Sequence, residues 1–333
     1  MFSFFAIFVV AIIATGASAQ PFAQTSAQTS ANSLSQPLIV THKLPEFGDL
    51  KGKTFEQRVI QLALEKTQTK SNPFEMVPIN VISRTHAIAA LNQNLYENFV
   101  ILLSYEDALL ESGNLIYIPF PLELGALSYR ICYANKNIVG QVQGIHSLQQ
   151  LQQYKVGVGA GWVDAKILKH HRLQVVEGSN ITSLFRMTQA GRVDLFCPSP
   201  SEYFHELRGE KTSELQLDNK LALYYPLPKF LFAHKNSKPL LDRIQRGIEI
   251  AYKDGSYKQL WFETQGQAIV RADLGKRHLI KLENPFISSL SDDYQQYLFN
   301  PEEYLPDQPP TDARHQIPKP LQNRLQTNVH QDR

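Results

Sequence analysis

Apolar residues in the middle of the chain alternate between the spacing of buried strands and that of amphipathic helices. Short runs rich in valine, leucine and glycine are separated by segments whose apolar positions recur every three or four residues. One helical segment begins at Asn180, a preferred N-cap, and stops at Gly191, which readily takes the left-handed conformation at a helix end. Strands that alternate with helices pair in parallel through right-handed crossovers, so a βαβαβ unit is predicted. Its segments are 155–160, 162–171, 173–178, 180–191 and 193–197.

A second unit of the same kind precedes this one. Thr54 and Gln57 have the spacing of a capping box, which marks the start of a helix. Strands are predicted at 37–43, 74–81 and 98–103, and helices at 55–67 and 84–95. Ligands of parallel α/β sheets bind beyond the carboxyl ends of the strands, so we expect the functional residues at those ends.

Extended segments join the two units. An irregular stretch with Pro119, Pro121 and Gly125 leads into a strand at 128–135, and a second extended run at 221–235 leads back. The pattern therefore predicts an α/β protein with two βαβαβ-type lobes, joined by two extended hinge crossings and separated by a ligand cleft. The predicted division is lobe 1 at 37–127 plus 225–285, lobe 2 at 128–224, and a polar Pro/Gln-rich tail without a packed core at 286–333.

The first residues predict export. An apolar run at 1–16 is followed by Ala17-Ser18-Ala19, a small-x-small cleavage site, so residues 1–19 are predicted to be a signal peptide cleaved after Ala19. The charged start of a signal peptide is missing, which keeps an uncleaved anchor as the alternative. A Gln/Ser/Thr-rich stretch at 20–36 is predicted to be a flexible leader. These features favour a periplasmic location.

Charge and cysteine content narrow the choice of function. The 333 residues carry a formal net charge of +2 with scattered Lys and Arg, which argues against nucleic-acid binding. The only cysteines, Cys132 and Cys197, both lie in strand-like runs. This placement favours small buried thiols over a disulfide, although an oxidising compartment permits the bond.

Three segments, in their order and spacing, resemble the type II periplasmic solute-binding proteins, close to solute-binding protein family 3. They are HSLQQLQQYKVGVGAGW, SLFRMTQAGRVDLF and LLDRIQRGIEIAYKDGSYKQLW, and the resemblance covers about 37–285. Four further motifs resemble a proteobacterial branch of periplasmic proteins: Gly125–Arg130, Gly161–Asp164, Gly191–Phe196 with Glu202, and Arg277–Pro285.

The resemblance implies charged anchors for an amino-acid ligand, and this chain departs from both. Family members that bind α-amino acids use an arginine of lobe 1 in a T-x-x-R setting, but the matching stretch here, Leu103–Asp107, carries acids. The family's carboxylate for the ligand ammonium falls on Ser199. A standard α-amino acid is therefore not the expected ligand.

Eight residues are candidates for ligand contact, and most have a structural alternative. Trp162 is a candidate for stacking on a ligand or packing in the core, and Asp164 for a polar contact or for stabilising a helix start. Ser199 and Glu202 have the spacing of a capping box. Backbone amides at the Gly159–Trp162 turn are candidates for an anion site, or serve only a tight turn. The eight predicted ligand-binding residues are Phe47, Ser104, Arg130, Gly161, Trp162, Asp164, Ser199 and Glu202.

These observations predict a monomeric protein that closes over a small polar solute and feeds an ABC permease or a membrane sensor. No metal is expected, because the adjacent His170 and His171 point apart on a helix. No cofactor is expected either. One alternative is a dehydratase-like enzyme that uses Asp107, Asp164 or Glu202 as general acid or base. The other is a sensory or interaction module without a small ligand.

Overall fold

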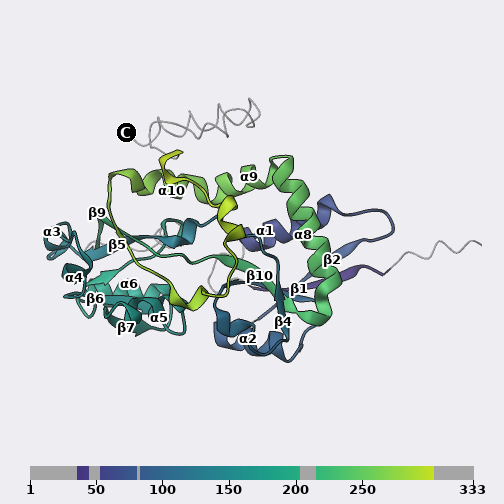
Figure 1. Ribbon diagram of the computed structural model, residues 1–333, viewed down its shortest axis with the longest axis horizontal. Coiled ribbons are helices and arrows are strands. Elements are labelled where there is room, and N and C mark those ends of the chain that lie inside the picture. Colours follow the sequence, from purple (N-terminus) through teal and green to yellow (C-terminus); the bar gives the residue numbers. More distant parts are fainter. Residues whose placement is uncertain (1–35, 45–52, 81–82, 203–214, 304–333) are drawn as a thin grey trace, which may run out of the picture. The chain divides into compact units, whose positions relative to one another are not determined.

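Two β-sheets with helices packed on them make up the described part of the chain (Figure 1). The computed structural model describes residues 36–44, 53–80, 83–202 and 215–303. These residues belong to one compact unit. The predicted signal peptide and Phe47 lie outside the described residues, as do the leader up to residue 35 and the tail beyond residue 303.

The first sheet has the strand order β2-β1-β3-β10-β4. Its first three strands are parallel, and β10 runs antiparallel to both β3 and β4. The strands are β1 (Leu38–Lys43), β2 (Phe74–Ile79), β3 (Phe99–Ser104), β4 (Leu115–Tyr117) and β10 (Lys229–His234). The helices of this half are α1 (Phe55–Lys66), α2 (Arg84–Asn92), α8 (Lys238–Lys253) and α9 (Ser256–Trp261).

The second sheet has the order β11-β9-β5-β8-β6-β7. Strands β6, β7 and β8 are parallel, and β5 runs antiparallel to β8 and β9. The strands are β5 (Tyr129–Asn135), β6 (Lys155–Gly159), β7 (Gln174–Gly178), β8 (Leu195–Phe196), β9 (Leu215–Tyr224) and β11 (His278–Lys281). The helices are α3 (Val139–Val142), α4 (Leu148–Leu151), α5 (Val163–His170) and α6 (Ile181–Gln189).

Both sheets share one topology, and it confirms the predicted α/β fold with two βαβαβ units. In each, the first strand of the unit lies between the second and the third, as in β2-β1-β3 and β7-β6-β8. Each sheet then takes in a strand that follows a crossing between the sheets, β10 in the first and β5 in the second. We call the first sheet with its helices lobe 1 and the second lobe 2.

Local signals explain where several helices begin. Thr54 and Gln57 form the predicted capping box of α1, and Asn180 caps α6 by accepting a hydrogen bond from the Ser183 amide. Helix α8 packs its buried stripe against α1 so closely that a Cβ on Gly247 would lie 2.0 Å from the Ala63 carbonyl oxygen. Among the described residues, no helix is long and apolar enough to cross a membrane.

Cys132 and Cys197 form a disulfide, so the preference for buried free thiols is wrong. Strand β5 pairs with β8 in a register that places Tyr133 opposite Phe196. The next pair along this antiparallel ladder is Cys132 and Cys197, which are 65 residues apart in sequence. Because the bond depends on which strands are neighbours, the sequence alone does not reveal it.

The segment 285–303, which we call the strap, packs on the protein, so the prediction of an unpacked tail from residue 286 is wrong for these residues. The Tyr294 ring is buried 6.1 Å from Phe230, and the Phe299 amide donates a hydrogen bond to the Leu124 carbonyl. Aromatic residues spaced among polar ones supply the packing, which the overall polar composition hides. The preceding strand β11 pairs with β9 of lobe 2, although its residues were predicted to belong to lobe 1.

The remaining turns of helix lie mostly in connections and in the strap. Helix α9 continues through a π-helical stretch, Phe262–Gly266, into α10 (Gln267–Ala272). Short 3-10 turns are present at Asp107–Leu109, Ala126–Ser128, Lys235–Ser237, Leu274–Lys276, Pro285–Ile287, Asp292–Tyr297 and Pro301–Glu303.

Candidate functional site

The turn from β6 into α5 brings Gly161 and Trp162 to the end of the second sheet. A Cβ on Gly159 would lie 2.1 Å from the Trp162 ring, so the half-buried indole lies directly on the backbone of its own turn. Gly161 has a φ of +75° and is exposed, and a Cβ there would lie 3.8 Å from the Thr85 hydroxyl oxygen in α2. The end of this lobe 2 strand therefore faces the start of a lobe 1 helix.

The amides of this turn already have acceptors within the protein. Ala160 donates to the Gly178 carbonyl at 2.8 Å, and Trp162 donates to the Gly159 carbonyl at 3.1 Å. The Gly161 amide donates to the Glu177 carboxylate, whose pKa is lowered mainly by its hydrogen bond from Lys169 and also by this amide. An anion would have to compete with these partners, so the amides act first as structural donors.

Arg130 is the centre of a buried charged network behind this turn. Its side chain is only 3% exposed and forms ion pairs with Asp164 at 2.7 Å and Glu202 at 3.2 Å. The guanidinium lies 5.4 Å from the centre of the Tyr225 ring, and the Tyr225 hydroxyl donates to Asp164 at 2.7 Å. Burial alone would lower the pKa of Arg130, but the charge of Asp164, with contributions from Tyr225 and Glu202, raises it.

Ser199 and Glu202 form the capping box that the sequence offered as their structural explanation. The Ser199 amide and hydroxyl both donate to Glu202 Oε2 at 2.9 Å, and the Glu202 amide donates back to the Ser199 hydroxyl at 3.4 Å. Ser199 is completely buried. Ser199 therefore caps the start of a helix and keeps the Glu202 carboxylate beside Arg130.

The end of β3 carries Glu106, which joins the two lobes. The Glu106 side chain is 6% exposed and binds Arg84 of α2 at 2.8 Å through Oε1 and Lys166 of α5 through Oε2. Arg84 also donates to the Ser104 carbonyl at 3.2 Å. Burial alone would raise the pKa of Glu106, but the hydrogen bond from Lys166 and the charge of Arg84 lower it.

Asp107, the next residue, holds the strap. It accepts hydrogen bonds from the Ser288 hydroxyl at 2.9 Å and from the Ser289 amide and hydroxyl. The hydroxyls of Tyr105 and Ser289 are also within hydrogen-bond distance, at 3.2 Å. Consecutive residues at the end of β3 thus contact both lobe 2 and the strap.

Two further carboxyl groups of lobe 1 have few hydrogen bonds or nearby cations to offset the cost of burying their negative charge. Glu56 accepts a hydrogen bond from the Leu102 amide at 2.8 Å, and burial raises its pKa to about 7. Burial also raises the pKa of Glu123, whose Oε1 lies 4.0 Å from the Lys229 ammonium. Glu123 Oε2 is buried and has no hydrogen-bond partner among the residues that the structure describes. Both groups hold a proton more tightly than an exposed glutamate does.

No protein-family model matches the chain, and a comparison with curated proteins finds no match. Solved structures do match. The GluR0 ligand-binding core in complex with L-glutamate superposes with a TM-score of 0.53 at 13% identity, over 69% of this chain and 98% of that one. The chain has the fold of a type II periplasmic binding protein. Identity this low establishes the fold alone, and it confirms the sequence resemblance at that level.

Other proteins with the periplasmic binding protein fold include binding proteins and sensor domains. An ancestral arginine-binding protein bound to arginine has a TM-score of 0.50 and 18% identity, over 69% of this chain and 99% of that one. A histidine kinase sensor domain with similarity to periplasmic binding proteins has a TM-score of 0.51 and 14% identity, over 70% of this chain and 97% of that one. The fold therefore serves both groups.

Within this periplasmic binding protein fold, the predicted site residues separate into two groups. Gly161, Trp162 and Ser104 lie at strand ends near the junction of the lobes, whereas Arg130, Asp164, Ser199 and Glu202 form the buried network. Glu106, Arg84 and Lys166 were not among the predicted site residues. The only sequence signal near Glu106 was the presence of acids in Leu103–Asp107, the stretch that matches the family's arginine motif.

The three carboxylates proposed as general acid or base of a dehydratase are each bound by other groups of the protein. Asp164 and Glu202 are bound by Arg130, and Asp107 by Ser288 and Ser289. In the described ranges, no group of three or more His, Cys, Asp and Glu side chains is placed to hold a metal ion.

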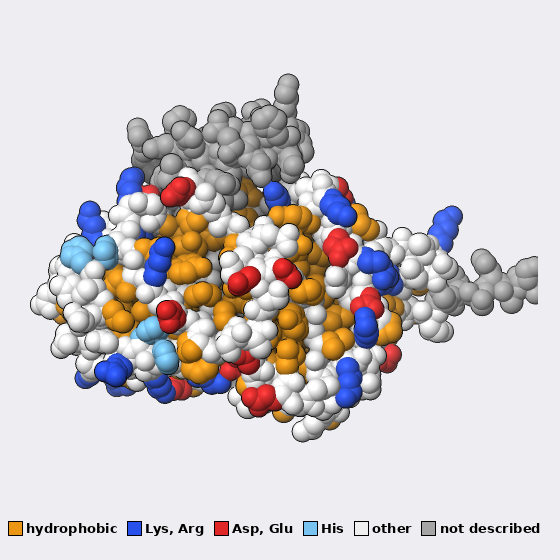
Figure 2. Space-filling model, viewed as in Figure 1, with side chains coloured by type: hydrophobic (Ala, Val, Ile, Leu, Met, Phe, Trp, Pro, Cys, Tyr) orange, Lys and Arg blue, Asp and Glu red, His pale blue; other side chains and the backbone are white. Residues whose placement is uncertain are grey.

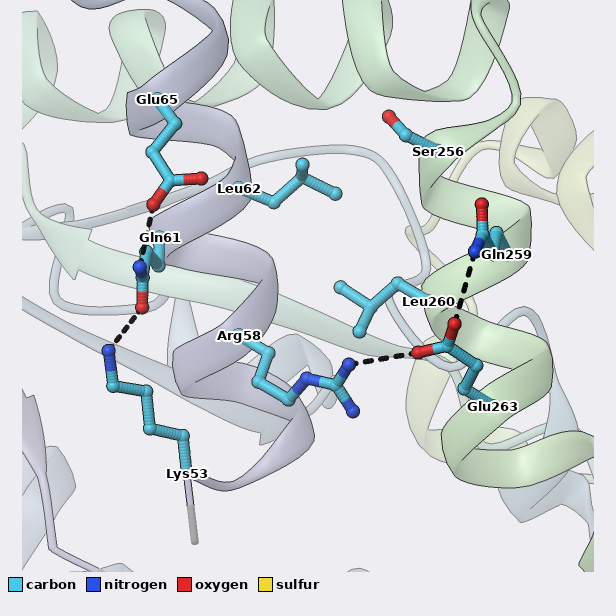
Figure 3. Close-up of a pocket in the computed structure, with 9 residues that line it drawn as sticks. All are labelled: Lys53, Arg58, Gln61, Leu62, Glu65, Ser256, Gln259, Leu260 and Glu263. Carbon is cyan, nitrogen blue, oxygen red and sulfur yellow. Dashed lines mark hydrogen bonds and ion pairs between the residues drawn. The ribbon is translucent and has the colours of Figure 1, made fainter. Parts of the chain in front are cut away.

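A surface pocket of about 460 Å³ lies between α1 and α9, in lobe 1 (Figure 3). Figure 3 shows Leu62 and Leu260 facing each other, with Arg58 and Glu263 paired at 3.0 Å across the two helices. None of the described predicted site residues lines it. Arg58 and Glu263 bind each other, and Lys53 and Glu65 both contact Gln61, so the charged groups of this pocket have partners within the protein.

Proposed function

We propose that this protein is a periplasmic two-lobed binding protein that receives a small polar solute between its lobes. The observation that supports this is the meeting of strand ends: Glu106 after β3 binds Lys166 of α5, and Gly161 faces Thr85. Solutes of parallel α/β folds bind beyond such ends. The two crossings between the sheets would act as the hinge, and an ABC permease or a membrane sensor would recognise the closed monomer.

The charges at the junction bear on the ligand. Arg84, Arg130 and Lys166 each have a carboxylate partner within the protein, and Lys229 lies near Glu123. A ligand carboxylate would have to displace one of these partners, which costs the pairing energy of a partly buried ion pair. We therefore propose a polar solute without a free carboxylate, in agreement with the loss of the family's amino-acid anchors.

Native mass spectrometry of protein purified without denaturation tests this function, followed by a thermal-shift screen. The screen contains amines, polyamines, quaternary amines, neutral polar solutes and, for comparison, organic acids and amino acids. Saturating a site at a hundred times its Kd stabilises the folded state by about 2.7 kcal/mol, which a melting curve resolves. Failure of every compound, with no copurified molecule, would count against solute binding.

One observation favours a second candidate, a sensory module that works without a small ligand. The contact between the lobes is made by the protein's own Glu106 and Lys166. A module of this kind would be closed in the absence of solute and would give no thermal shift in the same screen. Measuring closure and solute binding separately distinguishes the two candidates.

A further inference from the structure

We propose that Glu106 is a built-in substitute for a ligand carboxylate, which holds the lobes closed without solute and excludes acidic solutes from the cleft. This inference rests on the proposed function, because it names the residue that determines specificity at the same site. Its two consequences, closure and exclusion, are measurable on the protein alone.

The geometry of Glu106 is that of a bound acid between two cations. Oε1 binds Arg84 of lobe 1 at 2.8 Å, and Oε2 binds Lys166 of lobe 2. The carboxylate is 6% exposed, whereas the Lys166 side chain is 52% exposed. Arg84 is oriented by its hydrogen bond to the Ser104 carbonyl. Each carboxylate oxygen is thus paired with a cation from a different lobe.

Lys166 extends from a helix that is itself firmly anchored. Asp164, two residues earlier in α5, is held by Arg130 and by the Tyr225 hydroxyl. The Lys166 ammonium also lies 6.0 Å from the centre of the Phe286 ring, within the range of a cation–π contact. The strap that carries Phe286 is fixed to lobe 1 by Asp107. The ion pair therefore joins two rigid supports.

This arrangement predicts selectivity against anions. A carboxylate that is part of the chain competes at an effective concentration of millimolar or more, because its backbone position is fixed. An external acid must displace Glu106 before it reaches Arg84 and Lys166. Replacing Glu106 by glutamine removes the competing charge and leaves two cations, one from each lobe, facing the vacated position.

Small-angle X-ray scattering of ligand-free protein tests closure, and succinate titration followed by melting temperature tests exclusion. The variants are Glu106→Gln and Lys166→Gln, with Lys169→Gln as the matched control. Lys169 lies on the same helix α5 as Lys166, but it pairs with Glu177 at 2.7 Å, within lobe 2. Lys166→Gln leaves the Arg84–Glu106 pair intact, so its folding does not depend on an unpaired buried charge.

We expect both Glu106→Gln and Lys166→Gln to increase the radius of gyration, and Lys169→Gln to match the wild type. We also expect succinate to bind Glu106→Gln at least tenfold more tightly than wild type. If Glu106→Gln and Lys166→Gln both have the wild-type radius of gyration, Glu106 does not hold the lobes closed. If Glu106→Gln binds succinate no more tightly than the wild type does, Glu106 does not exclude acidic solutes. Neither result depends on the solute screen, so the proposed function fails or survives separately.

Discussion

Replacing Asp164 by asparagine removes the charge opposite buried Arg130 while keeping the side-chain volume and one acceptor for the Tyr225 hydroxyl. If the network of Arg130 is mainly structural, this change destabilises the protein in the absence of any ligand. If Arg130 is held available for a solute, the change has little effect on stability. The experiment therefore decides whether Arg130 is a structural residue or a ligand-binding residue.

The size of the effect follows from the geometry. The two side chains are 3% and 9% exposed, and their nearest atoms are 2.7 Å apart. Charge centres roughly 4 Å apart interact by about 4 kcal/mol at the effective dielectric constant of a protein site. Breaking a buried pair costs about 3–5 kcal/mol, and Glu202 remains to compensate Arg130 at 3.2 Å. We expect a loss of about 3 kcal/mol, which lowers Tm by roughly 6–12 °C for a chain of this size.

Urea unfolding followed by circular dichroism, at neutral pH without reductant, measures the loss. Lys169→Gln is the control, because Lys169 also lies on α5 but the side chains of its pair with Glu177 are 57% and 38% exposed. Exposed pairs contribute at most about 1 kcal/mol. A loss for Asp164→Asn no greater than that of the control would refute the structural role of the network.

Three further predictions concern the disulfide, a buried carboxyl and the strap. Serine at both Cys132 and Cys197 removes a cross-link over 65 residues and should cost about 4 kcal/mol in urea unfolding; an unchanged midpoint would contradict it. Because burial raises the pKa of Glu56 from 4.5 to about 7, the folded state keeps a proton that the unfolded state has released between these values. Stability should therefore fall by up to about 3 kcal/mol as pH rises from 4.5 to 7, and Glu56→Gln should flatten this profile; an equally steep profile in the variant would exclude Glu56 as the cause. Gly125 has a φ of +83° and its Cβ would lie 2.8 Å from Leu298 of the strap, whereas Gly113 has a φ of +65° and open space. Both alanine variants should lose about 1–2 kcal/mol of unfolding free energy, because alanine is strained at a positive φ. Gly125→Ala should lose about 1–3 kcal/mol more, because its Cβ clashes with the strap; equal losses would show that the strap moves aside without cost.

Much of the fold is predictable from the sequence, because its signals are local. The alternation of strand-like and helix-like spacing identifies both βαβαβ units. The capping boxes that begin at Thr54 and Ser199 each mark a helix start, and each is complete within four consecutive residues. The parallel pairing and right-handed crossovers within each unit follow, since strands that alternate with helices have few alternative connections.

The candidate site is different, because its contacts join residues that are distant in sequence. Glu106 lies in the stretch Leu103–Asp107, where acids replace the family's arginine motif, but its partner Lys166 is 60 residues away in the other lobe. Arg130 and Asp164 are recognisable as a cation and an acid near strand ends, yet only their mutual burial shows that they neutralise each other.

The sequence therefore determines the order of the elements, their caps and the α/β class. All three depend on residues that are close together in the chain. The cysteine pairing, the packing of the strap and the ion pair between the lobes are set by the tertiary structure. Each of these depends on which strands are neighbours and how the sheets face each other. Those relations arise from packing over the whole molecule, and no short stretch of sequence records them.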